Sequence, residues 1–253
     1  MNSIKLKTLQ NFPLIEPGDH LSSIILDCLE KNNLYLDHGD VIVIAQKVVS
    51  KSENRYVNLL DITPSSKALK ISKKLNKDPA FVELILRESN EIISTEKNVI
   101  IVEHKLGFVN VNAGIDRSNI PQNNNIVLLL PEDPSSSSQK IYKDLTLKTE
   151  KRISIIITDS MTRPYRAGVT NFALASTNIQ SLIDLKGEKD IYGNVLQATE
   201  IAIADELAAA AGLLMGQGND GSPIIIIRGF NRAGYKKNDA FDLIIKKEDD
   251  LYR

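Results

Sequence analysis

The stretch from residue 152 to residue 168, RISIIITDSMTRPYRAG, constrains the fold of this chain more than any other. Residues 153–157 are rich in isoleucine, with charged residues before them and turn-forming residues after them. Such a run is typical of a strand that is buried on both faces of a sheet. We therefore expect a buried strand here that ends at residues 158–160.

An acid and a hydroxyl come at the end of this expected strand, and two arginines follow at once. Asp159 and Ser160 offer the oxygen ligands that magnesium and manganese prefer. The paired guanidiniums of Arg163 and Arg166 suit a clamp on a phosphate or a carboxylate. A strand followed by an ordinary Asp/Ser turn is also common in α/β proteins. Taken alone, the stretch leaves both interpretations open.

The composition limits the classes of partner and metal. A formal net charge of -1 on 253 residues gives no electrostatic argument for nucleic acid or an anionic membrane. Cys28 is the single cysteine, so no internal disulfide can form, and its apolar neighbours predict a buried thiol. With it, the scattered His20, His38 and His104 argue against zinc and leave a hard cation held by oxygen ligands. No run reaches 18 apolar residues and no signal-type segment opens the chain, which predicts a cytoplasmic protein.

Apolar periodicity predicts strands and helices along the whole chain. Capping residues before a proline mark two of the helix starts, at Thr63-Pro64 and Asp78-Pro79. The segment 184–193 is loop-like, the tail beyond Tyr235 is expected to be peripheral, and no repeat or clean boundary divides the chain, so we expect a single unit over 1–253. The other expected strands cover residues 4–8, 41–45, 99–102, 108–111, 126–130, 169–175 and 224–227, and the other expected helices cover 19–31, about 135–147 and 197–214.

Further polar residues come at the ends of expected elements. Asp116 follows an Asn-Ala-Gly turn, and Gln217 lies in the glycine-rich loop 216–221, which can bring backbone N–H groups close to a phosphate. A plain helix-to-strand turn explains this loop equally, because it matches neither a Walker A nor a Rossmann pattern. Lys47 and Lys51 share a face if the strand before them continues; they suit a polyphosphate or are simply solvated.

Together the motifs resemble a known family, the coenzyme F420-0:gamma-glutamyl ligases. The resemblance covers residues from about 5 to about 235 and preserves the order and spacing of the motifs. They are PLI(x)PGD, the strand leading to VVSK, VNAGID(x)SN, ITDS(xx)RP(x)R, D(xx)GN(x)L, ADELAAAAGLLMGQG and P(xxxx)RG.

The resemblance implies an enzyme, a GTP-dependent ligase that joins L-glutamate to the deazaflavin precursor coenzyme F420-0 and then adds γ-linked glutamates. It also implies an α+β fold with mixed, largely antiparallel sheets and flanking helices, different from the Rossmann and P-loop folds. A homodimer, two divalent ions (Mg²⁺ or Mn²⁺) and a helpful K⁺ complete the expectation.

Carried over by position, the resemblance assigns roles to individual residues. The arginines Arg163 and Arg166 and the lysine Lys51 are the expected catalytic residues. The expected metal ligands are Asp116, Asp159, Ser160 and Gln217. The expected nucleotide contacts are Gln10, Asn11, Phe12, Pro13, Gln46, Lys47, Lys51, Asn119, Met215, Gly216, Gln217, Gly218, Asn219, Asp220, Gly221 and Ser222.

Two departures from the family pattern keep alternatives open. Residues 161–165, MTRPY, lack the usual glycine and have tyrosine where tryptophan is common, and the first loop has Gln10-Asn11 where glycine is usual. The first departure keeps open a γ-glutamyl ligase for another carboxylated cofactor. A non-catalytic GTP-binding regulatory protein and a metal-dependent phosphohydrolase are alternatives of other kinds. Asp205-Glu206, within the expected alanine-rich helix, need partners if they are buried; the plainer expectation is a face toward solvent or a dimer partner.

Overall fold

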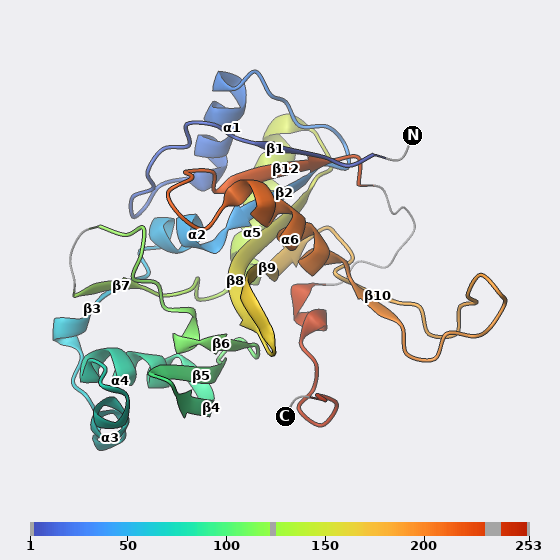
Figure 1. Ribbon diagram of the computed structural model, residues 1–253. Coiled ribbons are helices and arrows are strands. Elements are labelled where there is room, and N and C mark those ends of the chain that lie inside the picture. Colours follow the sequence, from blue (N-terminus) through green and yellow to red (C-terminus); the bar gives the residue numbers. More distant parts are fainter. Residues whose placement is uncertain (1–2, 122–124, 231–238, 252–253) are drawn as a thin grey trace.

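A computed structural model describes residues 3–121, 125–230 and 239–251 of the chain (Figure 1). Among these residues no helix is long and apolar enough to cross a membrane. The elements are, in chain order, β1 (Lys5–Thr8), α1 (Leu21–Lys31), β2 (Val41–Ala45), α2 (Gln46–Ser52), β3 (Tyr56–Asn58), η1 (Leu59–Asp61), α3 (Ser66–Leu75), α4 (Pro79–Arg87), β4 (Ser89–Glu96), β5 (Val99–His104), β6 (Val109–Val111), η2 (Asn112–Gly114), β7 (Ile126–Leu128), α5 (Pro134–Thr149), β8 (Ser154–Arg163), β9 (Arg166–Thr177), β10 (Leu182–Asp184), β11 (Glu200–Ala202), α6 (Ile203–Met215), β12 (Ile224–Arg228) and η3 (Ala240–Leu243).

A central sheet has the strand order β1-β12-β2-β8-β9. β2 pairs in parallel with β8, and the other neighbouring strands of this sheet are antiparallel. β2, with the sequence VIVIA, and the first half of β8 are buried, as their apolar runs predict. The expectation of an α+β protein with mixed, largely antiparallel sheets and flanking helices is confirmed.

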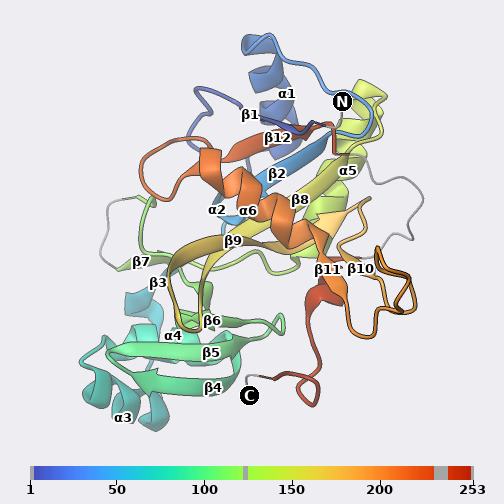
Figure 2. The same cartoon turned by 45° about the vertical axis from the view of Figure 1, so that its right-hand side comes forward.

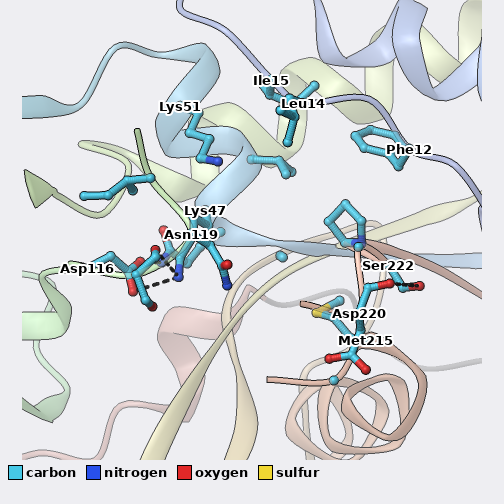
Figure 3. A pocket seen from close by; sticks show the side chains of 18 of the residues that line it. Phe12, Leu14, Ile15, Lys47, Lys51, Asp116, Asn119, Met215, Asp220 and Ser222 are labelled. Carbon is cyan, nitrogen blue, oxygen red and sulfur yellow. Dashed lines mark hydrogen bonds and ion pairs between the residues drawn. The ribbon is translucent and has the colours of Figure 1, made fainter. Parts of the chain in front are cut away.

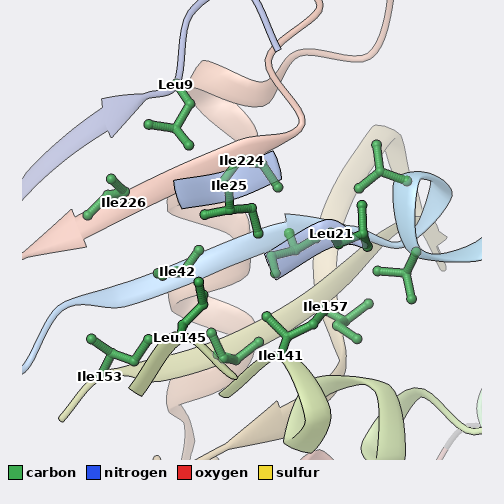
Figure 4. Close-up of a cluster of buried hydrophobic side chains, with 14 of the residues drawn as sticks. Leu9, Leu21, Ile25, Ile42, Ile141, Leu145, Ile153, Ile157, Ile224 and Ile226 are labelled. Atoms are coloured by element: carbon green, nitrogen blue, oxygen red, sulfur yellow. The ribbon is translucent and has the colours of Figure 1, made fainter. Parts of the chain in front are cut away.

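Apolar clusters lie on both faces of this sheet, because successive side chains of a strand point to opposite faces. On one face Ile42 packs with Ile25 of α1 and Leu145 of α5 (Figure 4), and Cys28 is buried in the same cluster. On the other face, α6 crosses the sheet (Figure 2) and packs on Val43 with small residues such as Ala208. The sheet therefore holds its loops on a rigid support.

A second region, formed by residues 56–129, has its own apolar cluster. β4, β5 and β6 form an antiparallel sheet against which α3 and α4 pack. Asp78 caps α4 as expected, since its Oδ1 accepts the N–H groups of Ala80 and Phe81. The cap of α3 is Ser65, two residues past the expected cap, Thr63. Figure 1 shows this region below the central sheet.

The expected end of the strand at residues 158–160 is wrong. β8 continues to Arg163 and forms a long hairpin with β9, whose turn holds Pro164 and Tyr165. The side chains are buried up to Thr158 and become exposed toward the tip. The polar residues thus mark where the burial ends, while the hydrogen-bond ladder carries the strand onward.

The condition attached to the shared face of Lys47 and Lys51, that the strand continues, is not met. Residues 46–52 form helix α2 and do not extend the strand. Ser50 Oγ donates to Gln46 Oε1 at 2.9 Å across one helical turn, and Val48 and Val49 are buried. Lys47 and Lys51 still lie on one face, because residues four apart are neighbours on a helix.

Other bounds shift because neighbouring segments pair. The helix expected over 197–214 begins at Ile203, because β11 pairs with β10. The helix expected from residue 19 begins at Leu21, since Asp19 Oδ2 accepts the Glu16 N–H at 2.8 Å and closes a turn. Strand β4 was not predicted from its polar sequence, SNEIISTE. The described part of the tail is not wholly peripheral, because Ala240 is buried against the α6 cluster, while residues 235–238 lie outside the described residues.

Candidate functional site

A cavity of about 830 Å³ opens where the central sheet meets the loop that follows η2. Segments far apart in the sequence form its walls: the chain after β1, the start of α2, the loop around Asp116, the middle of β8 and the loop between α6 and β12. Figure 3 shows Lys47 and Asp116 on one side of the cavity and Phe12, Met215 and Ser222 on the other.

Most of the residues assigned from the sequence line this cavity. They come from five segments and include both aspartates, both lysines and the whole glycine-rich loop. They are Phe12, Pro13, Gln46, Lys47, Lys51, Asp116, Asn119, Asp159, Ser160, Met215, Gly216, Gln217, Gly218, Asn219, Asp220, Gly221 and Ser222.

Four assigned residues lie elsewhere. Gln10 and Asn11 form a turn that is tied to α1, where Asn32 Oδ1 accepts the Gln10 N–H at 3.0 Å. Arg163 and Arg166 are paired across the exposed tip of the β8–β9 hairpin and are not part of the cavity wall. Their predicted roles stay predictions.

Asp116 is held by backbone pairing and by two polar side chains. Its N–H and C=O both bond to Leu128, at 2.9 and 3.0 Å, which fixes the loop after η2 against β7. Gln46 Nε2 donates to Asp116 Oδ2 at 2.7 Å, and Lys47 Nζ lies 3.0 Å from Asp116 Oδ1. The carboxylate is therefore oriented by α2 before any ligand arrives.

Asp159 comes one residue after a bulge that opens the β8–β9 ladder between Ile157 and Thr158. At this bulge, Asp205 Oδ1 accepts the Ala173 N–H at 2.8 Å, and the partly buried Asp205 side chain anchors α6 to β9. The expectation that Asp205 faces solvent or a dimer partner is therefore wrong. Bulges of this kind aim side chains beside functional sites.

The two carboxyl groups are electrostatically coupled. Burial, followed by the negative charge of Asp116, raises the pKa of Asp159 from 3.8 to about 7. Lys47 and a hydrogen bond from Gln46 oppose this shift without cancelling it. The surroundings of Asp159 thus disfavour a negative charge on its carboxyl group, an imbalance that a bound cation would remove.

This imbalance is the observation that fits a hard divalent cation to the site. The described residues contain no group of three or more histidine, cysteine or acidic side chains that could hold a metal. A cation here would take two carboxylates, Asp116 and Asp159, together with the hydroxyl of Ser160 and the amide oxygen of Gln217. Magnesium and manganese accept such sparse oxygen sets, because they keep waters and bind substrate phosphates.

The two lysines give the cavity its positive side. Lys47 Nζ also donates to the Ser118 carbonyl at 3.2 Å. Burial, and then the charge of Lys47, lowers the pKa of Lys51. Two ammonium groups in one partly buried wall favour the binding of an anion with several charges.

The glycine-rich loop needs glycine at one position for a steric reason. Gly216 has φ 70° and ψ -176°, a conformation essentially restricted to glycine. A Cβ there would lie 2.0 Å from Asp220 Oδ2. Asp220 in turn accepts the Gly218 N–H at 3.1 Å, and Asn119 Nδ2 donates to the Gly218 carbonyl at 2.9 Å. The loop is therefore tied to the Asp116 segment.

Several lining residues were not singled out from the sequence: Glu16, Tyr56, Ser118 and Asn171. Burial, followed by the negative charge of Glu16, raises the pKa of Tyr56. Neither belongs to a pattern with a known spacing. Asn171 is 6% exposed, and its position opposite Ser160 follows from the hairpin, which the sequence alone did not predict.

The fold and the cavity define a class: a mixed α+β protein in which acidic and basic side chains meet a glycine-rich loop in one cavity. Comparison with known proteins makes the class specific. A family model described as "F420-0:Gamma-glutamyl ligase" matches residues 10–229. The chain belongs to this family.

Archaeal relatives are similar over nearly the whole chain. A protein of Methanothermobacter thermautotrophicus is 39% identical over 99% of both chains. One from Methanocaldococcus jannaschii is 43% identical over 86% of both chains, and one from Archaeoglobus fulgidus is 36% identical over 99% of this chain and 96% of its own. Each of the three is named "Coenzyme F420:L-glutamate ligase".

Proposed function

We propose that this protein is a GTP-dependent ligase that adds L-glutamate to coenzyme F420-0 and then adds γ-linked glutamates. The names of its relatives support the acceptor and the amino acid. One observation carries the proposal: a single cavity holds the carboxylates of Asp116 and Asp159 beside Lys47, Lys51 and the glycine-rich loop. This combination suits a metal-bound polyphosphate.

The nucleotide is proposed to lie along α2 and the glycine-rich loop. Lys47 and Lys51 neutralise phosphate charge, and the loop offers backbone N–H groups that no Cβ obstructs at its glycines. Lys47 shares its charge between Asp116, 3.0 Å away, and the phosphates. Asn119 ties the glycine-rich loop to the segment that carries Asp116, because its side chain donates a hydrogen bond to the Gly218 carbonyl.

Two divalent ions, Mg²⁺ or Mn²⁺, are proposed at Asp116, Asp159, Ser160 and Gln217, with K⁺ as an activating ion carried over from the family resemblance. Bound there, they would offset the negative charge of the transferring phosphoryl group. The carboxylates would hold them, and Gln46 keeps the Asp116 carboxylate in place by its hydrogen bond of 2.7 Å.

In the proposed reaction, a carboxylate oxygen of the acceptor attacks the γ-phosphorus of GTP, and GDP leaves. The product of this attack is an acyl phosphate. This activation is needed because a free carboxylate oxygen is a poor leaving group. The amine of glutamate then attacks the acyl carbon, phosphate leaves and the amine loses a proton. Arg163 or Arg166 is proposed to hold a carboxylate or phosphodiester of the acceptor from the hairpin tip.

A homodimer is also proposed. Large apolar side chains on the β8–β9 hairpin support it, since Tyr165 is fully exposed and Val169 is 47% exposed. Exposed aromatic residues beside arginines are common at interfaces.

The test is a phosphate-release assay with GTP, Mn²⁺, L-glutamate and F420-0, each omitted in turn, with mass spectrometry of the product. Release that needs all four components, with one glutamate residue added to the precursor, supports the proposal. Release without the precursor indicates a phosphohydrolase. GTP binding without release indicates another carboxylated acceptor or a regulatory role, which competition by F420-0 for glutamate transfer separates.

A further inference from the structure

Asn171 is a buried polar residue at the base of the cavity to which no role has been assigned so far. It lies on β9, directly opposite Ser160 in the β8–β9 register, and is 6% exposed. A buried amide is costly unless its donor and acceptor groups are both used. Its partners therefore indicate what it does.

Both ends of the Asn171 amide are used, and the partners fix which way it points. Nδ2 donates to the thioether sulfur of Met215 at 3.7 Å. Because a thioether has no hydrogen to donate, the NH₂ end of Asn171 must face the sulfur. Oδ1 then faces Gln217 and accepts a hydrogen bond from Gln217 Nε2 at 2.9 Å.

The hydrogen bond to Asn171 also determines the orientation of the Gln217 amide. Since its NH₂ group is bound to Asn171, its Oε1 is the end left to act as a ligand. We propose that Asn171 is a positioning residue that orients the Gln217 amide so that its oxygen faces the cation of the site. This inference rests on the metal site of the proposed function and adds to it a residue that acts through Gln217.

The helix that faces Asn171 is shaped to admit it. Gly212 lies inside α6, where glycine is unfavourable for a helix. A Cβ at Gly212 would lie 2.9 Å from Asn171 Oδ1 and 3.0 Å from its Cγ, so glycine leaves the space that the amide fills. Gly212→Ala should therefore favour the helix and yet displace the amide, without changing Asn171 itself.

The experiment measures Mn²⁺ binding to the full chain by electron paramagnetic resonance of the free ion. Wild type is compared with Asn171→Leu, which has the same branched side-chain skeleton but no donor or acceptor, and with Gly212→Ala. We expect each variant to bind Mn²⁺ about ten-fold more weakly, within the range for outer residues that orient ligands. Leu145→Ala is the control for lost stability, because Leu145 is buried in the α1/α5 cluster on the opposite sheet face from α6; its affinity should not change.

A second background shows whether Asn171 acts through the amide. In Gln217→Glu both ends of the side chain are oxygens, so orientation no longer decides whether an oxygen faces the cation. Adding Asn171→Leu to that background should weaken binding less than about three-fold. An equal loss in both backgrounds would overturn the inference, as would wild-type affinity in both Asn171→Leu and Gly212→Ala.

Asp116→Asn separates this inference from the proposed function. If Mn²⁺ binds in wild type and Asp116→Asn abolishes the binding, the site is where we propose it, and the Asn171 and Gly212 variants decide the inference. If wild type does not bind Mn²⁺, or if Asp116→Asn binds it normally, the proposed metal site is wrong and the inference falls with it.

Discussion

His104 links the second region to the hairpin that carries the site. Its side chain is 3% exposed and stacks on Phe108, with ring centroids 5.1 Å apart. Phe108 in turn contacts Phe172 of β9, again at 5.1 Å, and Phe172 pairs with Asp159 across the hairpin. Two ring contacts therefore connect His104 to the strand that pairs with Asp159.

The structure gives the direction and size of the effect of pH. Burial lowers the pKa of His104 from 6.5 to about 4, and the charges of Lys105 and Arg55 add to this. Nδ1 also accepts the Leu106 N–H at 3.0 Å, which a protonated ring cannot do. The unfolded chain takes up this proton at a higher pH than the folded protein, so this contribution to stability is full above pH 6.5 and is lost as the pH falls toward 4. The whole shift corresponds to about 3 kcal/mol, of which about 2 kcal/mol is lost at pH 5.

The measurement is chemical unfolding of wild type and His104→Asn at pH 7 and pH 5. The asparagine can still accept a hydrogen bond but does not titrate, so the fall in unfolding free energy between the two values should be smaller by about 2 kcal/mol. Leu145→Ala is the control, since it lowers stability by about 2–5 kcal/mol through a cavity and adds no titrating group. If His104→Asn keeps the full wild-type difference, the reasoning is refuted.

Three further predictions concern the site and a fourth concerns the dimer. Asp159→Asn should lower turnover by on the order of 10²-fold or more at saturating metal, and near-normal turnover would contradict its role as a ligand. Gly216→Ala should weaken GTP binding by roughly 1–3 kcal/mol because of backbone strain, measured by titration calorimetry; unchanged affinity would show that the loop does not contact the nucleotide. Lys51→Met keeps the length of the side chain but removes its charge, and should weaken GTP by about 1–3 kcal/mol; an effect only on the acceptor would move Lys51 to another subsite. Tyr165→Glu should shift a dimer toward monomer in sedimentation velocity, and a wild-type monomer would refute the dimer.

The sequence predicted the buried strands better than the polar ones. Residues 41–45 and 224–227 are apolar on both faces, and short runs of this kind are typical of strands buried inside a sheet. β4 has no such run, and its pairing with β5 is interrupted by two register shifts. Its strand structure depends on a partner, which a pattern within the segment cannot show.

The candidate site was predicted from resemblance more than from periodicity. The aspartates, lysines and glycine-rich loop gather in one cavity although the elements that carry them were partly mispredicted. Lys47 and Lys51 share a face on a helix as they would on a strand, so the prediction that they share a face holds although residues 46–52 are helical. The inferred role of Asn171 could not be predicted in this way, because it depends on the hairpin register and on a glycine in a helix far away in the sequence.

In the proposed function, the physical problem at this site is to keep two acidic side chains near each other before a cation binds. Two side-chain amides, those of Gln46 and Gln217, are fixed in opposite orientations. Gln46 accepts from Ser50 and so must present its NH₂ group to Asp116, which stabilises the carboxylate. Gln217 gives its NH₂ group to Asn171 and so presents its oxygen, which only a cation or a donor can use. Because both orientations are set by neighbours within the protein, the proposed binding of metal and nucleotide would need little reorganisation, and the preorganised dipoles would contribute to the proposed chemical step.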